Sequence, residues 1–185
     1  MNIAVYSGSF NPLHIGHLAI MKHLLEVAGF DMVYLIVSPK NPLKDSISSD
    51  SGAERYKAAV EAVDRHFTAQ VKVDAIELTM PEPHYTIRTL DTLKAREPEN
   101  SFTLVMGADN LADIRRWKDY GHILSEYGTA VFPREGYDLT QIKQDLLNED
   151  PDYKIHILSA EMVDVSSTHI REAIAEGRDI SHLLM

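Results

Sequence analysis

The chain has 185 residues, of which 44% are hydrophobic and 25% are charged. This is ordinary globular composition, and we expect residues 1–185 to form a single domain with a substantial core. The 18 Lys and Arg residues stand against 28 Asp and Glu residues, a formal net charge of −10, which repels polyphosphate backbones and argues against a nucleic-acid partner. The absence of cysteine excludes disulfides, thiolate nucleophiles and cysteine-based zinc sites.

The N-terminus begins with a strand-like run and lacks both the basic and the apolar region of a signal peptide. The longest apolar runs, such as 33–37, are far shorter than the roughly 20 residues that span a bilayer. We therefore expect a cytoplasmic protein with no membrane partner.

Short β-rich runs alternate with longer helical stretches along the whole chain. This alternation predicts an α/β fold with an open, mainly parallel sheet and helices on both of its faces. The expected strands are Asn2–Ser7, Met32–Val37, Val71–Ile76, Phe102–Met106, Thr129–Phe132 and Lys154–Leu158. The expected helices are His14–Ala28, Glu54–His66, Ile87–Arg96, Lys118–Glu126, Leu139–Asn148 and Thr168–Glu176.

Two proline-containing stretches, Ser38–Ser51 and Thr79–Thr86, are expected to be loops. Loops that leave the carboxyl ends of strands line the ligand crevice of open α/β sheets, so substrate contacts are expected in these two segments.

The first strand leads into the first helix through Gly8-Ser9-Phe10-Asn11-Pro12-Leu13-His14-Ile15-Gly16-His17. A strand, a glycine turn and a helix start form a phosphate-binding arrangement, because amide groups and the positive end of the helix dipole converge there. The loop is neither a Walker A loop nor a dinucleotide fingerprint. His14 and His17, spaced three apart, are predicted to project from one face and donate hydrogen bonds to phosphate oxygens. The alternative is a tight turn at Gly8 with surface histidines or half of a zinc site, although no H-E-x-x-H pattern supplies a further ligand.

A second notable segment is Val165-Ser166-Ser167-Thr168-His169-Ile170-Arg171-Glu172. Simple helix capping by Ser166 or Ser167 is one interpretation. Three adjacent hydroxyls with a guanidinium one turn later also make a good polyphosphate clamp. Two such anion sites predict a ligand with several phosphates.

Together the two segments resemble the nucleotidyltransferase superfamily, whose members carry an H-x-G-H loop and an I-S-S-T-x-x-R-type segment. Within it, further stretches resemble the bacterial nicotinate-nucleotide adenylyltransferases: Pro83 to Leu90, Val105 to Asn110, Arg116 to Leu124 and Val131 to Arg134. The resemblance implies a Rossmann-like nucleotidyltransferase fold. It also implies that ATP and nicotinate mononucleotide are joined to give nicotinate adenine dinucleotide and pyrophosphate in NAD biosynthesis.

The resemblance also implies roles for individual residues. The implied catalytic residues are His14, His17 and Arg171. The implied ATP-binding residues are Gly8, Ser9, Phe10, Gly107, Asp109, Ser166, Ser167 and Thr168, with segment 166–185 completing the phosphate site. The implied nicotinate mononucleotide contacts are Lys44, Tyr85, Thr86, Trp117 and Arg134. Mg²⁺ is expected to arrive with ATP, held by phosphates and water rather than by a protein metal site. The sequence departs from the family pattern at Leu43, before Lys44, and at Arg88.

Several alternatives remain at this stage. The acceptor could be phosphopantetheine or nicotinamide mononucleotide, or the chain could be a cytidylyltransferase, a non-catalytic nucleotide-binding protein or a flavodoxin-like partner-binding domain. Trp117 could be a core residue and Asp109 a helix cap. Assembly into a homo-oligomer is left open.

Overall fold

The computed structural model describes residues 1–39, 51–161 and 165–185. Most of the predicted loop Ser38–Ser51, including Lys44, lies outside these residues.

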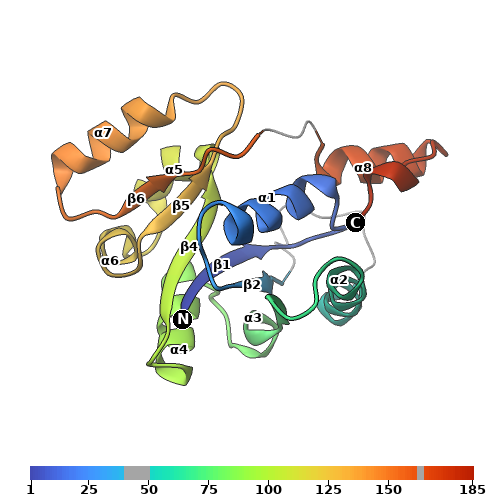
Figure 1. Cartoon of the computed structure of the whole chain (residues 1–185), viewed down its shortest axis with the longest axis horizontal. Coiled ribbons are helices and arrows are strands. Elements are labelled where there is room, and N and C mark those ends of the chain that lie inside the picture. The colour runs from blue at the N-terminus through green and yellow to red at the C-terminus, as the bar shows by residue number, and fades with distance from the viewer. Residues whose placement is uncertain (40–50, 162–164) are drawn as a thin grey trace.

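The centre of the fold is a six-stranded sheet in the order β3-β2-β1-β4-β5-β6, and every neighbouring pair of strands is parallel (Figure 1). The strands are β1 (Asn2–Gly8), β2 (Met32–Val37), β3 (Val71–Asp74), β4 (Ser101–Gly107), β5 (Thr129–Phe132) and β6 (Ile155–Ile157). The predicted open parallel α/β sheet is therefore confirmed. The strand order reverses between β1 and β4, which is the position where open α/β sheets bind ligands at the carboxyl ends of their strands.

Both faces of the sheet are buried, as the side chains of β1 show. Ile3 and Val5 belong to one core cluster, whereas Ala4 and Tyr6 belong to another. Since successive side chains of a strand point to opposite faces, the two clusters lie on the two sides of the sheet.

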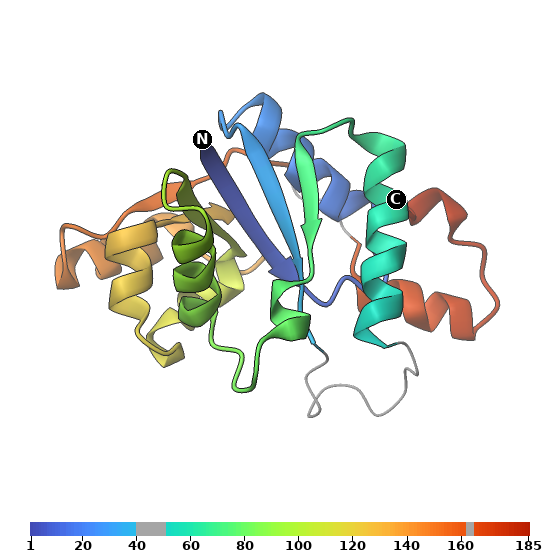
Figure 2. The ribbon, with the colours of Figure 1, turned by 90° about the horizontal axis from the view of Figure 1, so that it is seen from below.

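Helices cover both faces (Figure 2). Helices α1 and α2 contribute to the cluster around Ala4, whereas α4, α5 and α7 contribute to the cluster around Ile3. The helices are α1 (Ile15–Glu26), α2 (Gly52–His66), α3 (Ile76–Thr79), α4 (Thr86–Arg96), α5 (Ala108–Ala112), α6 (Tyr120–His122), α7 (Leu139–Glu149) and α8 (Ser167–Ala175). Shorter 3₁₀ turns, η1 (Ile114–Arg116) and η3 (Ser181–Leu183), and a π-helical turn, η2 (Ile123–Tyr127), complete the described structure.

Several predicted elements begin or end one or two residues away from the observed ones, and two of the differences have a clear local cause. The strand expected to reach Ile76 ends at Asp74, because the buried Asp74 carboxylate accepts a hydrogen bond of 3.0 Å from the Ile76 amide and turns the chain into α3. The single helix expected over Lys118–Glu126 is instead α6 followed by η2. It starts late because Asp119 adopts a left-handed conformation with φ of 51°.

The C-terminal segment forms a small cluster of its own, separate from the two main ones. Val165, Ile170, Ala173 and Ile180 are buried together, and Ile15 of α1 packs against them. This contact places α8 beside the start of α1. Among the described residues, the helices are too short or too polar for any of them to cross a bilayer.

Candidate active site

The site begins at the loop from β1 to α1. The helix starts one residue later than predicted, so that His14 is its N-cap and not a member of its first turn. The Nδ1 atom of His14 accepts a hydrogen bond of 3.1 Å from the Gly16 amide, and Nδ1 of His17 accepts one of the same length from the His14 amide. The two rings stack with their centroids 3.7 Å apart. His14 and His17 thus form a reciprocal capping box of two imidazoles.

This capping box fixes the tautomer of each histidine. A neutral imidazole carries one proton, and a ring nitrogen that accepts an amide hydrogen bond cannot carry it. The proton of both rings therefore lies on Nε2. Each ring presents an N–H donor on the side away from the backbone.

Burial keeps both rings neutral. His14 is only 6% exposed, and desolvation together with the nearby Arg134 charge lowers its pKa from 6.5 to about 4. Burial also holds the pKa of His17 well below 6.5, with further lowering by His14 and Arg134. At neutral pH the site therefore holds two uncharged donors.

The start of α8 docks onto this loop. Ser166 caps the helix by accepting a hydrogen bond of 3.1 Å from the His169 amide, and Ser167 donates one of 3.0 Å to the Pro12 carbonyl. Arg171 donates a hydrogen bond of 2.7 Å to the Asn11 carbonyl and one of 3.3 Å to the Thr168 hydroxyl. The capping interpretation thus holds for Ser166, whereas the other polar groups connect α8 to the first loop.

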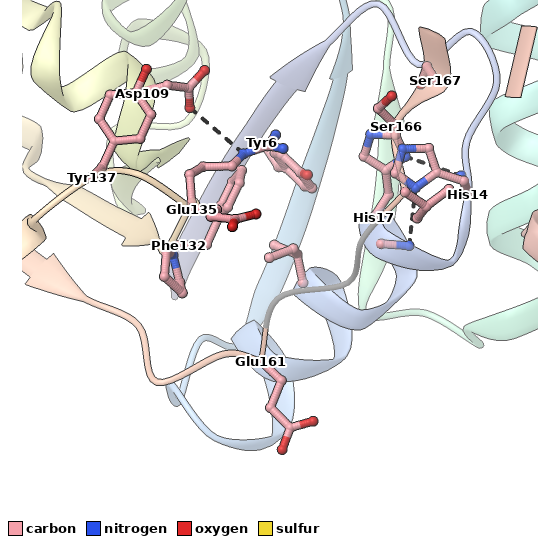
Figure 3. Close-up of a pocket in the computed structure, with 15 residues that line it drawn as sticks. Tyr6, His14, His17, Asp109, Phe132, Glu135, Tyr137, Glu161, Ser166 and Ser167 are labelled. Atoms are coloured by element: carbon pink, nitrogen blue, oxygen red, sulfur yellow. Dashed lines mark hydrogen bonds and ion pairs between the residues drawn. The ribbon is translucent and has the colours of Figure 1, made fainter. Parts of the chain in front are cut away.

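A cavity of about 660 Å³ opens between these elements and the ends of β4 and β5, a size typical of small-molecule sites. Figure 3 shows His14, His17, Ser166 and Ser167 on one side of it and Asp109, Phe132, Glu135 and Tyr137 on the other. The full lining is Tyr6, His14, Gly16, His17, Ile20, Asp109, Phe132, Pro133, Arg134, Glu135, Tyr137, Glu161, Val165, Ser166 and Ser167. Six residues of the predicted site therefore meet in one cavity.

Arg134 is the one lysine or arginine among the described residues that line the cavity. Its guanidinium lies 5.2 Å from the centre of the Phe132 ring and 3.8 Å from the Asp109 carboxylate. Asp109 lies in the first turn of α5 and does not occupy the N-cap position, which is Gly107. A Cβ at Gly107 would lie only 3.2 Å from Nε of Arg134, so this glycine leaves room for the arginine.

The predicted catalytic and ATP-binding residues that do not line the cavity are Gly8, Ser9, Phe10, Gly107, Thr168 and Arg171. The Ser9 carbonyl accepts a hydrogen bond from Arg55, and the Thr168 hydroxyl accepts one from Arg171. Phe10 is buried beneath the loop, with its ring edge-on to His17 at a centroid distance of 5.1 Å. A Cβ at Gly8 would lie 3.1 Å from the Phe10 ring. Gly8 and Phe10 therefore lie behind the histidines.

The predicted nicotinate contacts are only partly brought together. Trp117 lines a second, more open depression of about 860 Å³, with Ile87 at the start of α4 beside it. Thr86 is the first residue of that helix and Tyr85 is its exposed N-cap. Trp117 also packs against the core, so both interpretations of this residue have support. Of the residues predicted for nicotinate mononucleotide, Arg134 lines the first cavity and Trp117 the second, whereas Tyr85 and Thr86 line neither.

Some residues at or near the site were not predicted from the sequence. Arg55 of α2 is 3% exposed and donates hydrogen bonds of 2.8 and 2.7 Å to the carbonyls of Ser9 and Ser38. It joins the loops that follow β1 and β2. Glu135 and Tyr137 lie one and three residues after Arg134, and this closeness in the sequence was the signal available for them.

Within residues 1–39, 51–161 and 165–185, no three His, Asp or Glu side chains are grouped so that they could hold a metal ion. The hydrogen-bond donors that line the cavity are imidazole, hydroxyl and guanidinium groups, which suit phosphate oxygens. The carboxylates of Asp109, Glu135 and Glu161 line the cavity as well.

Comparison with known proteins places this site in a family. A family model described as Cytidylyltransferase-like matches residues 5–173. A relative from Flavobacterium johnsoniae, described as a probable nicotinate-nucleotide adenylyltransferase, is 36% identical over 100% of this chain and 92% of its own length. Relatives of the same description from Flavobacterium psychrophilum and Bacteroides fragilis are 38% and 37% identical over 100% and 97% of this chain, and over 92% and 85% of their own lengths.

Solved structures share the fold. The nicotinic acid mononucleotide adenylyltransferase of Plasmodium falciparum superposes with a TM-score of 0.75 at 18% identity, over 97% of this chain and 86% of that one. Its sequence is too distant to carry more than the fold. The curated relatives, in contrast, align along nearly the whole length of both chains. The chain therefore belongs to the nicotinate-nucleotide adenylyltransferase family.

Proposed function

We propose that the protein transfers the adenylyl group of ATP to nicotinate mononucleotide, giving nicotinate adenine dinucleotide and pyrophosphate. The single observation that carries this proposal is the pair of neutral imidazoles whose Nε2–H groups are left free of the capping box, beside the hydroxyl-rich start of α8. The proposal is supported by the names of the full-length relatives, which are described as enzymes of this reaction.

The chemistry needs no protein base. An oxygen of the mononucleotide phosphate, already anionic at neutral pH, attacks the α-phosphorus of ATP. The bond from that phosphorus to the bridging oxygen breaks, and pyrophosphate leaves with the electron pair. No proton passes to the protein, so the protein has to align the two phosphates and stabilise the charge that develops between them.

We assign that stabilisation to His14 and His17. Their Nε2–H groups are donors held by the backbone, and neutral donors of fixed direction do not have to reorganise as charge develops. Because both rings are uncharged, a pair of them 3.7 Å apart carries no mutual repulsion. Arg134, at the opposite wall, supplies the positive charge that attracts the phosphates.

We assign the leaving pyrophosphate to the N-terminus of α8. Ser166 and Ser167 line the cavity there, and the free amides of a helix start favour anions. Arg171 and Thr168 support this site without lining the cavity, since the Arg171 guanidinium donates hydrogen bonds to the Asn11 carbonyl and the Thr168 hydroxyl. Segment 166–185 would in this way complete the ATP phosphate site.

For the acceptor, we assign Trp117 and Thr86, with Tyr85, to the nicotinate ring, and Gly107 and Asp109 to the nucleotide side of the cleft. Gly8, Ser9 and Phe10 shape the loop that carries the histidines. Lys44 lies outside the described residues and is kept as a phosphate contact on the strength of the sequence resemblance alone. Mg²⁺ would be bound by the phosphates of ATP and by water, and its chemistry would be to neutralise the leaving pyrophosphate.

The proposal is tested by measuring pyrophosphate release with ATP and, side by side, nicotinate mononucleotide, nicotinamide mononucleotide and phosphopantetheine. We expect release with nicotinate mononucleotide, dependent on added Mg²⁺ and abolished by a chelator. Faster turnover of another acceptor would replace the proposed substrate. Tight ATP binding with no release from any acceptor would identify a nucleotide-binding protein without this activity.

A further inference from the structure

The last residues of the chain return to the start of α1. After η3, Leu184 forms an antiparallel β-bridge with His14, the N-cap residue whose ring faces the cavity. Figures 1 and 2 both place the C-terminal end close to α2. The returning segment thus contacts the backbone of one of the two histidines proposed to stabilise the transferred group.

The end of this segment is anchored in the main core. Met185 is 8% exposed and belongs to the same buried cluster as Leu13 and Met21, which flank the histidine pair in the sequence. Arg65, in the last turn of α2, donates a hydrogen bond of 3.2 Å to the main-chain oxygen of Met185. Two independent contacts, one apolar and one polar, therefore hold Met185 in place.

The other end of the segment is anchored elsewhere. Ile180 is buried in the small cluster that contains Ile170 of α8. The stretch between Ile180 and Met185 consequently connects the α8 cluster to the core beneath α1. One side of the cavity carries the α8 serines and the α1 histidines, so this connection ties together the two elements that supply them.

The position of the His14 backbone matters for both rings. Its amide donates to Nδ1 of His17, while its own ring accepts from Gly16. A shift of the His14 main chain would therefore displace the two Nε2–H donors together. Misplacing a catalytic group by about 1 Å can cost on the order of 10²-fold in rate.

We infer that residues 180–185 form a strap that positions the His14 backbone for adenylyl transfer, with Met185 and Arg65 as its anchor. Leu184 and Met185 are positioning residues, because they touch His14 and the core beneath it and do not line the cavity. This inference rests on the proposed function, because that function gives the histidine donors their catalytic role. The contact between Leu184 and His14 does not depend on it.

The test displaces the strap in two ways. Met185→Asp places a charge in the apolar cluster, and Met185→Leu is its conservative partner. Arg65→Ala removes the polar anchor from an exposed helix end, and Arg65→Lys can restore a donor. Arg178→Ala is the control, because Arg178 is an exposed arginine of the same C-terminal region that pairs with the exposed Glu176 and does not line the cavity. Each variant is assayed for kcat and for KM with ATP, and its thermal midpoint is measured.

We expect kcat to fall roughly tenfold to a hundredfold for Met185→Asp and about threefold to tenfold for Arg65→Ala, with KM for ATP within threefold of wild type. Met185→Leu, Arg65→Lys and Arg178→Ala should stay within about threefold in both constants. An unchanged kcat in Arg65→Ala and Met185→Asp would overturn the strap. If Met185→Asp does not fold, Arg65→Ala and its lysine rescue decide the question.

A second readout separates this inference from the proposed function. Imidazole ¹⁵N spectra report the tautomer of His14 without any substrate. We expect a single Nε2–H tautomer in wild type and a mixture in the strap variants. If the wild-type protein is inactive on ATP and nicotinate mononucleotide, yet its His14 spectrum differs from those of the strap variants in this way, the proposed function alone is refuted. Identical His14 spectra in wild type and both anchor variants refute the strap.

Discussion

The imidazoles of His14 and His17 are stacked 3.7 Å apart, and Nδ1 of each ring accepts a hydrogen bond from a backbone amide at the start of α1. The backbone therefore does more than carry these side chains, because it decides which nitrogen of each ring holds the proton. A pair of surface histidines at the same spacing would exchange tautomers freely.

Replacing His17 separates its capping role from its donor role. His17→Ala should lower kcat by about 10² to 10³, the usual loss when one transition-state donor is removed. His17→Gln keeps a side chain that can accept from the N-cap amide, as glutamine does in capping boxes, so it should recover thermal stability with little recovery of kcat. Melting curves and pyrophosphate release measure the two effects. Turnover of His17→Ala within tenfold of wild type would remove His17 from the catalytic assignment.

The depressed histidine pKa values make stability depend on pH. Burial lowers the pKa of His14 from 6.5 to about 4 in the folded state, so between these values the unfolded chain binds a proton that the folded chain does not. His17, whose pKa also lies well below 6.5, acts in the same direction. The free energy of unfolding should therefore have its full value above pH 6.5 and should decrease as the pH falls toward 4.

Urea unfolding at pH 7.5, 6.0 and 5.0 measures this loss. His14→Asn retains an N-cap acceptor but has no imidazole to protonate, and its stability should fall less over this range. His156→Gln, an exposed strand position, is the matched control and should follow wild type. An equal slope for wild type and His14→Asn would contradict the buried, neutral state of His14.

Arg134 should govern the attraction of phosphates to the cavity. Hydrogen bonds to a charged group contribute about 1.5 to 3 kcal/mol, so Arg134→Ala should raise KM for the nucleotides by roughly tenfold to a hundredfold. KM of the wild type should also rise with salt, and that dependence should weaken in the variant. Lys57→Ala, an exposed lysine of α2, serves as the control for general charge. Equal salt dependence in the variant and wild type would show that the attraction arises elsewhere.

Trp117 should affect the acceptor and not ATP. Aromatic stacking on a base contributes about 1 to 3 kcal/mol, so Trp117→Ala should raise KM for nicotinate mononucleotide by at least about fivefold with KM for ATP unchanged. Trp117→Phe keeps a ring and should recover most of the loss. Steady-state kinetics with each substrate varied in turn gives both constants. An equal rise in both would indicate that Trp117 acts through core packing.

Arg55 should connect fold stability to catalysis. Its guanidinium donates to the carbonyls of Ser9 and Ser38, at the carboxyl ends of two neighbouring strands. Arg55→Ala should therefore lower the free energy of unfolding by about 2 kcal/mol or more and also reduce kcat, because the histidine loop loses a support. Arg55→Lys supplies a single ammonium group in place of the forked guanidinium, so it should recover only part of the lost stability and kcat. Loss of stability with unchanged kcat would assign Arg55 to the fold alone.

Much of this arrangement follows from sequence patterns. The six strands were predictable because each is a short, β-rich run, and the start of α1 because its loop combines glycine turns with a helical apolar pattern. Boundaries set by the side-chain contact or the backbone conformation of a single residue were harder to predict. Asp74 ends β3 through a hydrogen bond to Ile76, and the left-handed Asp119 delays the next helix, and neither event leaves a periodic signal.

The candidate site shows the same division. His14, His17 and Ser166 could be identified from local motifs, because each lies at a helix start whose amide groups suit phosphate. Arg55 and Met185 could not, since their contacts join segments distant in the sequence, such as Arg65 and Met185 at a separation of 120 residues. A helix that reads as amphipathic gives no indication of which polar residue on it will be buried against a remote loop.

The docking of α8 on the first loop also affects how the molecule loses its activity. The hydrogen bond from Arg171 to Asn11 spans 160 positions of the chain, and the apolar residues beneath α8 form a cluster apart from the two that flank the sheet. Segments with few apolar contacts of their own open at lower free energy than the core. Under mild denaturant, the α8 segment should therefore detach while the sheet remains folded, and adenylyl transfer should disappear before the circular dichroism signal of the sheet does.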